Sequence, residues 1–299
     1  MRLLMLVVAA FASGCATLGP ANYRSFEVDV TRSYDLMYRG LPLRSGDFIV
    51  SDEGEAETLL FSLIGDAHSS FVHSGIVSIE RGRPYVYEAY ATVHPFGQQP
   101  PTDTARGGIQ RVTLEHYLQR QRISAVFTAS DNIDRTKVVS FAQARYRDGT
   151  AFDPYFNWLD HDALYCTEFV ALALHEGGAS LPVTTTIRRN PSLQVALDWL
   201  KVAAKDLVTA DALTVGAQRV ALISRRDSPI QIAAYFAAKR ELHARFTADQ
   251  KLGNIWRWTW RGLALQPQVA AFIDAARQHP EQSTKELTSA HFDAPSISD

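Results

Sequence analysis

One stretch constrains the fold of this chain more than any other, because it has the pattern of two paired β-strands. Residues 71–80 are FVHSGIVSIE, residues 85–93 are YVYEAYATV, and the turn-forming residues RGRP lie between them. β-Branched and aromatic residues on both sides of a Gly/Pro turn are typical of a β-hairpin. The sequence therefore predicts an antiparallel sheet that includes this hairpin.

Composition and charge exclude several classes of protein. The chain has 299 residues, of which 46% are hydrophobic and 21% charged, as in ordinary globular proteins and unlike disordered, collagen-like or coiled-coil chains. Its 30 Lys and Arg residues against 32 Asp and Glu residues give a net charge of −2, without the basic excess that nucleic acid binding requires. The mean hydropathy of −0.12 excludes a polytopic membrane protein. We therefore expect a neutral substrate and no nucleic acid partner.

The first residues, MRLLMLVVAAFASGC, have the pattern of a signal peptide. Arg2 precedes an apolar run from Leu3 to Phe11, which is shorter than the roughly 20 residues that a membrane-spanning helix needs. The segment ASGC resembles a bacterial lipobox, which implies cleavage after residue 14 and a lipid anchor on Cys15. By the same resemblance, Ala16 favours the outer membrane, facing the periplasm of the cell envelope. A frayed terminal helix is the alternative interpretation.

Lipidation of Cys15 would change the interpretation of Cys166. The chain has two cysteines, so Cys166 would then have no disulfide partner and would be a free thiol in an oxidising compartment. A single free cysteine can be an inert buried hydrophobic residue or a nucleophile. The residues around Cys166 have to decide between these interpretations.

His73 and Glu88 lie on opposite arms of the predicted hairpin. Their numbers sum to an odd value, so with an even-length loop both side chains lie on the same face of the sheet. They are then directly opposite or diagonal to each other, within roughly 5 to 8 Å. A carboxylate beside an imidazole can hold its tautomer and stabilise the imidazolium. The alternative is an ordinary polar pair on the solvent side of a sheet.

Cys166 lies in the first turn of a predicted helix, in the segment ALYCTEFVALALHEGG that ends at Gly177 and Gly178. A helix N-terminus favours a thiolate, which is the nucleophilic form of cysteine. Phe169, Val170 and Ala173 are spaced to share a helical face that packs on the sheet. A cysteine at a helix start facing an imidazole on a strand is the arrangement that thiol catalysis needs.

The motifs HSGIV, VYEAY, YRDGTAFDPYF and YCTEFV, in this order, resemble the YiiX-like branch of the NlpC-type, papain-like cysteine hydrolases. The resemblance covers Ser45 to Leu181 and implies an α+β fold in circularly permuted order, in which the histidine strand precedes the nucleophile helix. It implies that Cys166 is the nucleophile, His73 the general base and acid, and Glu88 the group that orients His73. Tyr165 would contribute to oxyanion stabilisation.

These patterns divide the chain into five segments. We expect a signal peptide (1–14), a tether (15–40), a permuted papain-like domain (41–190), a mainly helical extension (191–282) and a disordered tail (283–299). Helices are predicted at residues 31–38, 134–146, 192–204, 230–246 and 267–278, and a further strand at residues 218–224. The extension has no counterpart in the resemblance.

The implied function is a membrane-anchored cysteine hydrolase that cleaves amide or ester bonds through a thioester. In the envelope, peptidoglycan stem peptides and lipid acyl groups are both candidate substrates, and the sequence does not choose between them. The aromatic residues Phe152, Tyr155, Phe156 and Trp158 are expected either to wall the substrate cleft or to fill the core. The alternative function is a catalytically silent envelope adaptor on the same fold.

Two other features suggest different chemistry. Several residues are potential zinc ligands, but their spacing matches no H-E-x-x-H or C-x-x-C motif, so we expect no metal and no cofactor. These residues are Asp66, His68, His73, Asp160, His161, Asp162 and Cys166. The segment NIWRWTWRG alternates Trp256, Trp258 and Trp260 with Arg257 and Arg261, which is typical either of an interfacial or glycan-contacting strand or of tryptophans packed on the core.

Overall fold

The structure is a computed structural model. It describes residues 23–54, 56–91, 107–130, 132–189, 193–194, 197–198, 202, 204–249, 255–259 and 262–293. The predicted signal peptide (1–14) and the predicted lipidation site Cys15 lie outside the described residues. None of the helices in the described part of the chain is long and apolar enough to cross a membrane.

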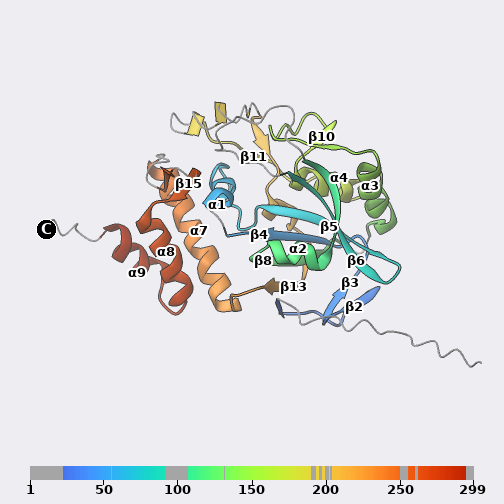
Figure 1. The fold of residues 1–299 in the computed structure, drawn as a ribbon, viewed down its shortest axis with the longest axis horizontal. Coiled ribbons are helices and arrows are strands. Elements are labelled where there is room, and N and C mark those ends of the chain that lie inside the picture. The colour runs from blue at the N-terminus through green and yellow to red at the C-terminus, as the bar shows by residue number, and fades with distance from the viewer. Residues whose placement is uncertain are drawn as a thin grey trace, which may run out of the picture.

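The centre of the molecule is a nine-stranded sheet (Figure 1). Its strand order is β1-β13-β8-β4-β5-β6-β7-β9-β10, and its strand pairs are antiparallel except for β9 with β10. The strands are β1 (Arg24–Phe26), β4 (Phe48–Asp52), β5 (His73–Glu80), β6 (Arg83–Ala91), β7 (Gly107–Thr113), β8 (Ile123–Thr128), β9 (Ala151–Phe152), β10 (Ala163–Leu164) and β13 (Gln218–Ser224). The predicted hairpin is present as β5 and β6, at the middle of this sheet.

Among the described residues, helices and three small two-stranded sheets surround the central sheet. The helices are α1 (Ala56–Leu63), α2 (Leu114–Arg120), α3 (Arg135–Arg147), α4 (Cys166–Glu176), α6 (Ala210–Leu213), α7 (Pro229–Asp249), α8 (Pro267–Gln278) and α9 (Thr284–Thr288), followed by a π-helical turn, Ser289–Asp293. The small sheets pair β2 (Leu36–Tyr38) with β3 (Leu41–Leu43), β11 (Thr185–Thr186) with β12 (Asp206–Leu207), and β14 (Trp256–Thr259) with β15 (Gly262–Leu265). The fold is therefore of the mixed α+β class.

Both faces of the central strands β4, β5, β6 and β8 are buried, because alternate residues of these strands enter different hydrophobic clusters. In β4, Phe48 and Val50 belong to a large cluster that also contains Phe169 of α4, whereas Ile49 belongs to a smaller cluster with Tyr117 of α2. α2 therefore covers one face of the sheet and α4 the other.

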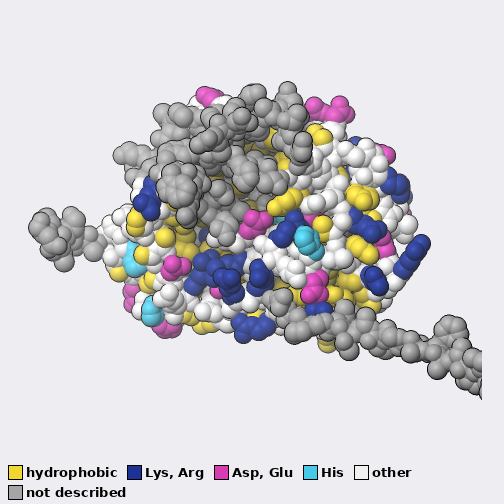
Figure 2. All heavy atoms as spheres, viewed as in Figure 1, with side chains coloured by type: hydrophobic (Ala, Val, Ile, Leu, Met, Phe, Trp, Pro, Cys, Tyr) yellow, Lys and Arg dark blue, Asp and Glu magenta, His cyan; other side chains and the backbone are white. Residues whose placement is uncertain are grey.

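On the side of the molecule shown in Figure 2, basic side chains lie among acidic ones, in keeping with the small net charge.

The N-terminal region differs from the prediction. Residues 23–40, expected to belong to the tether, are part of the fold, since β1 pairs with β13 and β2 pairs with β3. The helix predicted at residues 31–38 is wrong, because Leu36–Tyr38 is a strand. Arg39 and Gly40 follow it with positive φ angles of 49° and 83°, which form a tight turn into β3.

The C-terminal third is joined to the same sheet. The predicted strand at residues 218–224 is β13, which lies between β1 and β8, so a boundary at residue 190 does not separate two structural units. The helices predicted at residues 230–246 and 267–278 are confirmed as α7 and α8, whereas the one at residues 192–204 falls largely outside the described residues.

The expected disordered tail is ordered in its first part. Ser283 caps α9 by accepting the backbone N–H of Glu286, and Leu287 is buried against α7 and α8. α7, α8 and α9 pack together at one end of the molecule (Figure 1). Residues 294–299 of the predicted tail lie outside the described residues.

Candidate active site

The histidine–carboxylate pair lies where the hairpin pattern predicts it. His73 is the first residue of β5, and the register pairs Ile76 with Tyr87, so Glu88 lies diagonally across from His73 on the same face. The distance between His73 Nε2 and Glu88 Oε2 is 2.6 Å. Both side chains are buried, with exposed fractions of 9% and 0%. The short contact fixes the imidazole and leaves its Nδ1 for another partner.

The two residues after His73 explain the rest of the HSG motif. A Cβ atom at Gly75 would lie 2.5 Å from Val86 Cγ1 and 2.8 Å from the carbonyl oxygen of Tyr87, so only glycine allows β5 and β6 to approach this closely. The Ser74 hydroxyl points to the other face, where it donates a hydrogen bond to the backbone oxygen of Cys166 at 3.0 Å. The strand that carries the histidine is thus tied directly to the helix that carries the cysteine.

Cys166 is the first residue of α4, as the sequence predicts, and it is a free, buried cysteine. Its sulfur lies 3.7 Å from the backbone oxygen of Val72, and it is close enough to His73 to influence the pKa of the imidazole. Burial alone would lower the pKa of His73, but the hydrogen bonds and charges of Cys166 and Glu88 outweigh it and raise the pKa to about 10. At neutral pH the imidazole therefore carries a proton beside the sulfur.

Glu88 is held by partners that lie on later elements of the chain. Its Oε1 accepts hydrogen bonds from Gln110 Nε2 at 3.1 Å and from Arg120, which also lies over the ring of Tyr90. Burial alone would raise the pKa of Glu88, but the His73 and Arg120 contacts lower it. Glu88 therefore stays ionised although it is fully buried.

Gln110 and Arg120 were missed by the sequence reasoning. A signal for Gln110 exists, because it lies directly opposite Glu88 once β7 is paired with β6. Arg120 lies at the end of α2, and no local pattern places it near Glu88. Tyr117 of the same helix stacks on the ring of His73 at 5.8 Å, and its hydroxyl is 2.8 Å from the Ser51 hydroxyl.

Tyr165, expected to help stabilise an oxyanion, is the N-cap residue of α4. Its backbone N–H donates to Glu168 Oε2 at 3.3 Å, and its hydroxyl accepts the backbone N–H of Val208 at 3.0 Å.

Glu168 forms a second His–Glu pair close to the cysteine helix. Burial, followed by the nearby carboxylates of Asp153 and Asp160, raises the pKa of Glu168 to about 8. The second oxygen of Glu168 contacts His161 Nδ1 at 2.6 Å.

A narrow pocket of about 30 Å³ opens beside Cys166, and we call it the Cys166 pocket. Its walls include Phe61 of α1, Ile64 just after that helix, Phe71, Phe156, and residues 207–210. Of the aromatic residues expected at the cleft, Phe156 lines this pocket, while Phe152 and Trp158 pack against the large hydrophobic cluster. Phe156 also packs against that cluster, so the segment fills the core, and its place at a substrate cleft stays a prediction.

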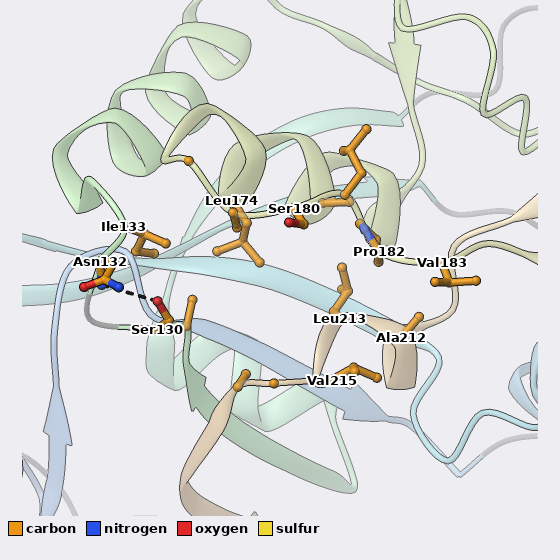
Figure 3. Close-up of a pocket in the computed structure, with 17 residues that line it drawn as sticks. Ser130, Asn132, Ile133, Leu174, Ser180, Pro182, Val183, Ala212, Leu213 and Val215 are labelled. Carbon is orange, nitrogen blue, oxygen red and sulfur yellow. Dashed lines mark hydrogen bonds between the residues drawn. The ribbon is translucent and has the colours of Figure 1, made fainter.

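Two other hollows lie away from the cysteine. One, of about 560 Å³, lies between the C-terminal half of α4 and the residues after α6, and Leu174, Pro182, Val183, Leu213 and Val215 line it (Figure 3). The other surrounds the β5–β6 turn and includes Arg81, Arg83 and Arg111. Neither of these two hollows is lined by Cys166. The candidate active site is therefore the Cys166 pocket.

The potential metal ligands do not converge. Within the described residues, no group of three or more His, Cys, Asp or Glu side chains is placed to hold a metal ion. His68 lies against His243 with ring centroids 5.6 Å apart, and burial lowers its pKa to about 3.

The tryptophan-rich segment forms the hairpin of β14 and β15. Trp256 is 3% exposed and packs edge-on against Phe246 of α7 at 6.1 Å. Core packing therefore describes Trp256. The side chains of Trp258, Trp260 and Arg261 lie outside the described ones.

The fold and site define a mixed α+β protein with a Cys–His–Glu constellation at the meeting point of a central strand and a helix start. No protein-family model matches the chain, and no curated protein matches it. Among solved structures, the chain is similar to the metalloprotein YiiX of Escherichia coli O157:H7, with 17% identity, a TM-score of 0.46, and coverage of 59% of this chain and 95% of that one.

Proposed function

We propose that this protein is a cysteine-dependent acyl hydrolase that cleaves an amide or ester bond through a thioester. The observation that carries the proposal is the position of His73, whose Nε2 lies 2.6 Å from Glu88 and whose pKa is raised by the neighbouring Cys166 and Glu88. A raised histidine pKa beside a sulfur favours the thiolate–imidazolium form, in which cysteine is nucleophilic.

In the first step, the Cys166 thiolate attacks the carbonyl carbon and a sulfur–carbon bond forms. The imidazolium of His73 gives its proton to the leaving nitrogen or oxygen as the bond to the carbonyl carbon breaks. Glu88, held by Gln110 and Arg120, keeps the imidazole in the orientation that this transfer needs. The products of this step are the released amine or alcohol and an acyl group on Cys166.

In the second step, water attacks the thioester carbonyl and gives a proton to His73, the carbon–sulfur bond breaks, and the carboxylic acid leaves. The oxyanion of both steps is stabilised by backbone N–H groups in the first turn of α4. The N–H of Tyr165 does not take part, because it donates to Glu168.

The permuted papain-like arrangement remains part of the proposal. The order of the chain supports it, since the histidine strand β5 precedes the cysteine helix α4 and both contact each other through Ser74. Attachment to the bacterial cell envelope through Cys15 is proposed from the sequence pattern, and it would bring the site close to peptidoglycan and to lipids.

The test is incubation of the mature protein with purified peptidoglycan and with an envelope lipid extract, followed by mass spectrometry of the products. We expect one of the two to lose an acyl linkage, and Cys166→Ser and His73→Ala to abolish the loss. His161→Ala, which alters the second His–Glu pair, is the matched control and should retain activity. Equal product patterns with wild type and Cys166→Ser would contradict the proposal and favour a silent adaptor.

A further inference from the structure

We propose that the Cys166 pocket binds the acyl side of the scissile bond and selects a short, uncharged, apolar acyl group. This inference rests on the proposed function and adds a substrate class to it. Four observations support it: the pocket lies away from His73, its polar groups are already hydrogen-bonded within the protein, its volume is small, and one of its walls comes from residues 207–210.

The position of the pocket identifies which part of the substrate it receives. Among the described residues, Cys166 and Val72 line the pocket, whereas His73 and Glu88 do not. The leaving group has to lie at the imidazole, because His73 supplies its proton. The substituent on the other side of the carbonyl carbon is therefore the one that faces this pocket.

The polar groups of the pocket are already engaged with the protein. The Ser69 hydroxyl donates to the backbone oxygen of Phe71 at 2.6 Å, and the Thr167 hydroxyl donates to that of Val208 at 2.6 Å. The hydroxyl oxygens of Tyr165 and Thr209 accept backbone N–H groups at 3.0 Å and 3.2 Å.

The remaining described walls are apolar. Phe61, Ile64, Phe71, Phe156 and Leu207 are among them, and no Asp, Glu, Lys, Arg or His side chain of the described residues lines the pocket. A charged acyl group would lose its hydration there without a compensating partner, which is costly in free energy. The lining therefore favours an uncharged group.

The size of the pocket limits the length of that group. A volume of about 30 Å³ holds little more than one or two water molecules, so a few methylene groups fill it. Phe156 of the β9–β10 connection forms part of the boundary, and its ring packs against Phe61 at 5.4 Å and Tyr165 at 5.3 Å. A longer chain requires this aromatic boundary to move.

One wall comes from the region beyond residue 190. Residues 207–210 are fixed to the start of α4 by the Tyr165 and Thr167 bonds to Val208, one on its N–H and one on its carbonyl oxygen. The C-terminal third therefore shapes the space beside the nucleophile, in addition to supplying β13. This gives the extension a role in substrate selection.

The test compares three p-nitrophenyl esters whose acyl groups have the same number of backbone carbons: butyrate, hemisuccinate and 4-aminobutyrate. Acylation is followed by p-nitrophenolate release and by intact mass, with the Cys166→Ser rate subtracted, and each rate is divided by that for N-acetylcysteine. We expect butyrate to exceed both charged esters by about tenfold or more.

Acylation of Cys166 by a charged ester as fast as by butyrate, on this scale, would overturn the inference and leave the proposed function standing. No acylation above the N-acetylcysteine rate with any ester would overturn the proposed function and the inference with it. The two failures are therefore distinguishable in one experiment.

A second comparison tests the length limit. Phe156→Ala should raise the octanoate-to-butyrate rate ratio by about tenfold, because it removes a ring from the pocket boundary. Phe152→Ala, which removes the same ring from the preceding strand β9 and outside the pocket, should leave the ratio unchanged. Equal ratios in the two variants would contradict the assignment of this pocket to the acyl chain.

Discussion

Replacing Lys239 with methionine tests how the C-terminal helices are held to the active-site sheet. Lys239 of α7 and Asp52 at the end of β4 form an ion pair in which both side chains are 0% exposed. The Lys239 ammonium also donates to the backbone oxygen of Ser70 at 2.7 Å, and the Tyr235 hydroxyl donates to Asp52 Oδ1 at 3.0 Å. Lys239→Met therefore leaves a buried carboxylate with one neutral partner and a carbonyl with none.

The magnitude follows from these contacts. Removing one partner of a buried ion pair costs about 3–5 kcal/mol, and the unpaired carbonyl adds about 1 kcal/mol. The remaining Tyr235 bond and the similar volume of methionine offset part of this cost. We therefore expect Lys239→Met to lower the free energy of unfolding by about 4 kcal/mol, measured by urea denaturation followed by tryptophan fluorescence.

Two further variants make this prediction refutable. Lys239→Met/Asp52→Asn removes both charges while the amide oxygen still accepts from Tyr235, so it should be more stable than Lys239→Met by about 1–2 kcal/mol. Glu241→Ala on the same helix removes a half-exposed partner of Arg245 and should cost less than about 1 kcal/mol. The reasoning is refuted if Lys239→Met costs no more than Glu241→Ala.

Three other variants probe the site. Gly75→Ala places a Cβ against Val86 and should lower the free energy of unfolding by about 1–3 kcal/mol in urea titrations, and an unchanged midpoint would contradict the packing argument. Glu88→Gln should lower the pKa of His73 from about 10, as read from an NMR titration of its ring, and an unshifted titration would show that Glu88 does not set it. Glu168 has a folded-state pKa of about 8, so between its unfolded value and pH 8 the native state holds a proton that the unfolded chain has released, and stability falls as pH rises. Glu168→Gln should therefore raise Tm relative to wild type at about pH 8.5 but not at about pH 5, whereas a constant difference at both values would contradict the pKa.

The features that could be predicted from the sequence are local. The hairpin, the shared face of His73 and Glu88, and the start of a helix at Cys166 each follow from patterns within about twenty residues. The same holds for α3, α7 and α8, whose periodicity and terminal residues mark their bounds. Local propensity and tertiary structure agree at these positions.

The features that could not be predicted depend on contacts between distant segments. β13 and β1 join the sheet far from the hairpin in sequence, and Arg120 reaches Glu88 only because α2 folds over the sheet. Lys239 is another example, since lysine is expected at the surface and its burial depends on a carboxylate 187 positions away. Such pairings leave no periodic signal in a single sequence.

The most direct test of the central claim is the pH dependence of Cys166 alkylation by iodoacetamide, read from the Cys166 peptide by mass spectrometry in wild type and His73→Ala. A sulfur paired with imidazolium should react at a nearly constant rate from about pH 6 to about pH 9, because His73 holds its proton over this range. In His73→Ala the rate should rise about tenfold per pH unit up to about pH 8, as for an ordinary thiol. The same rising profile in both proteins would contradict the claim that His73 and Cys166 act as a catalytic pair.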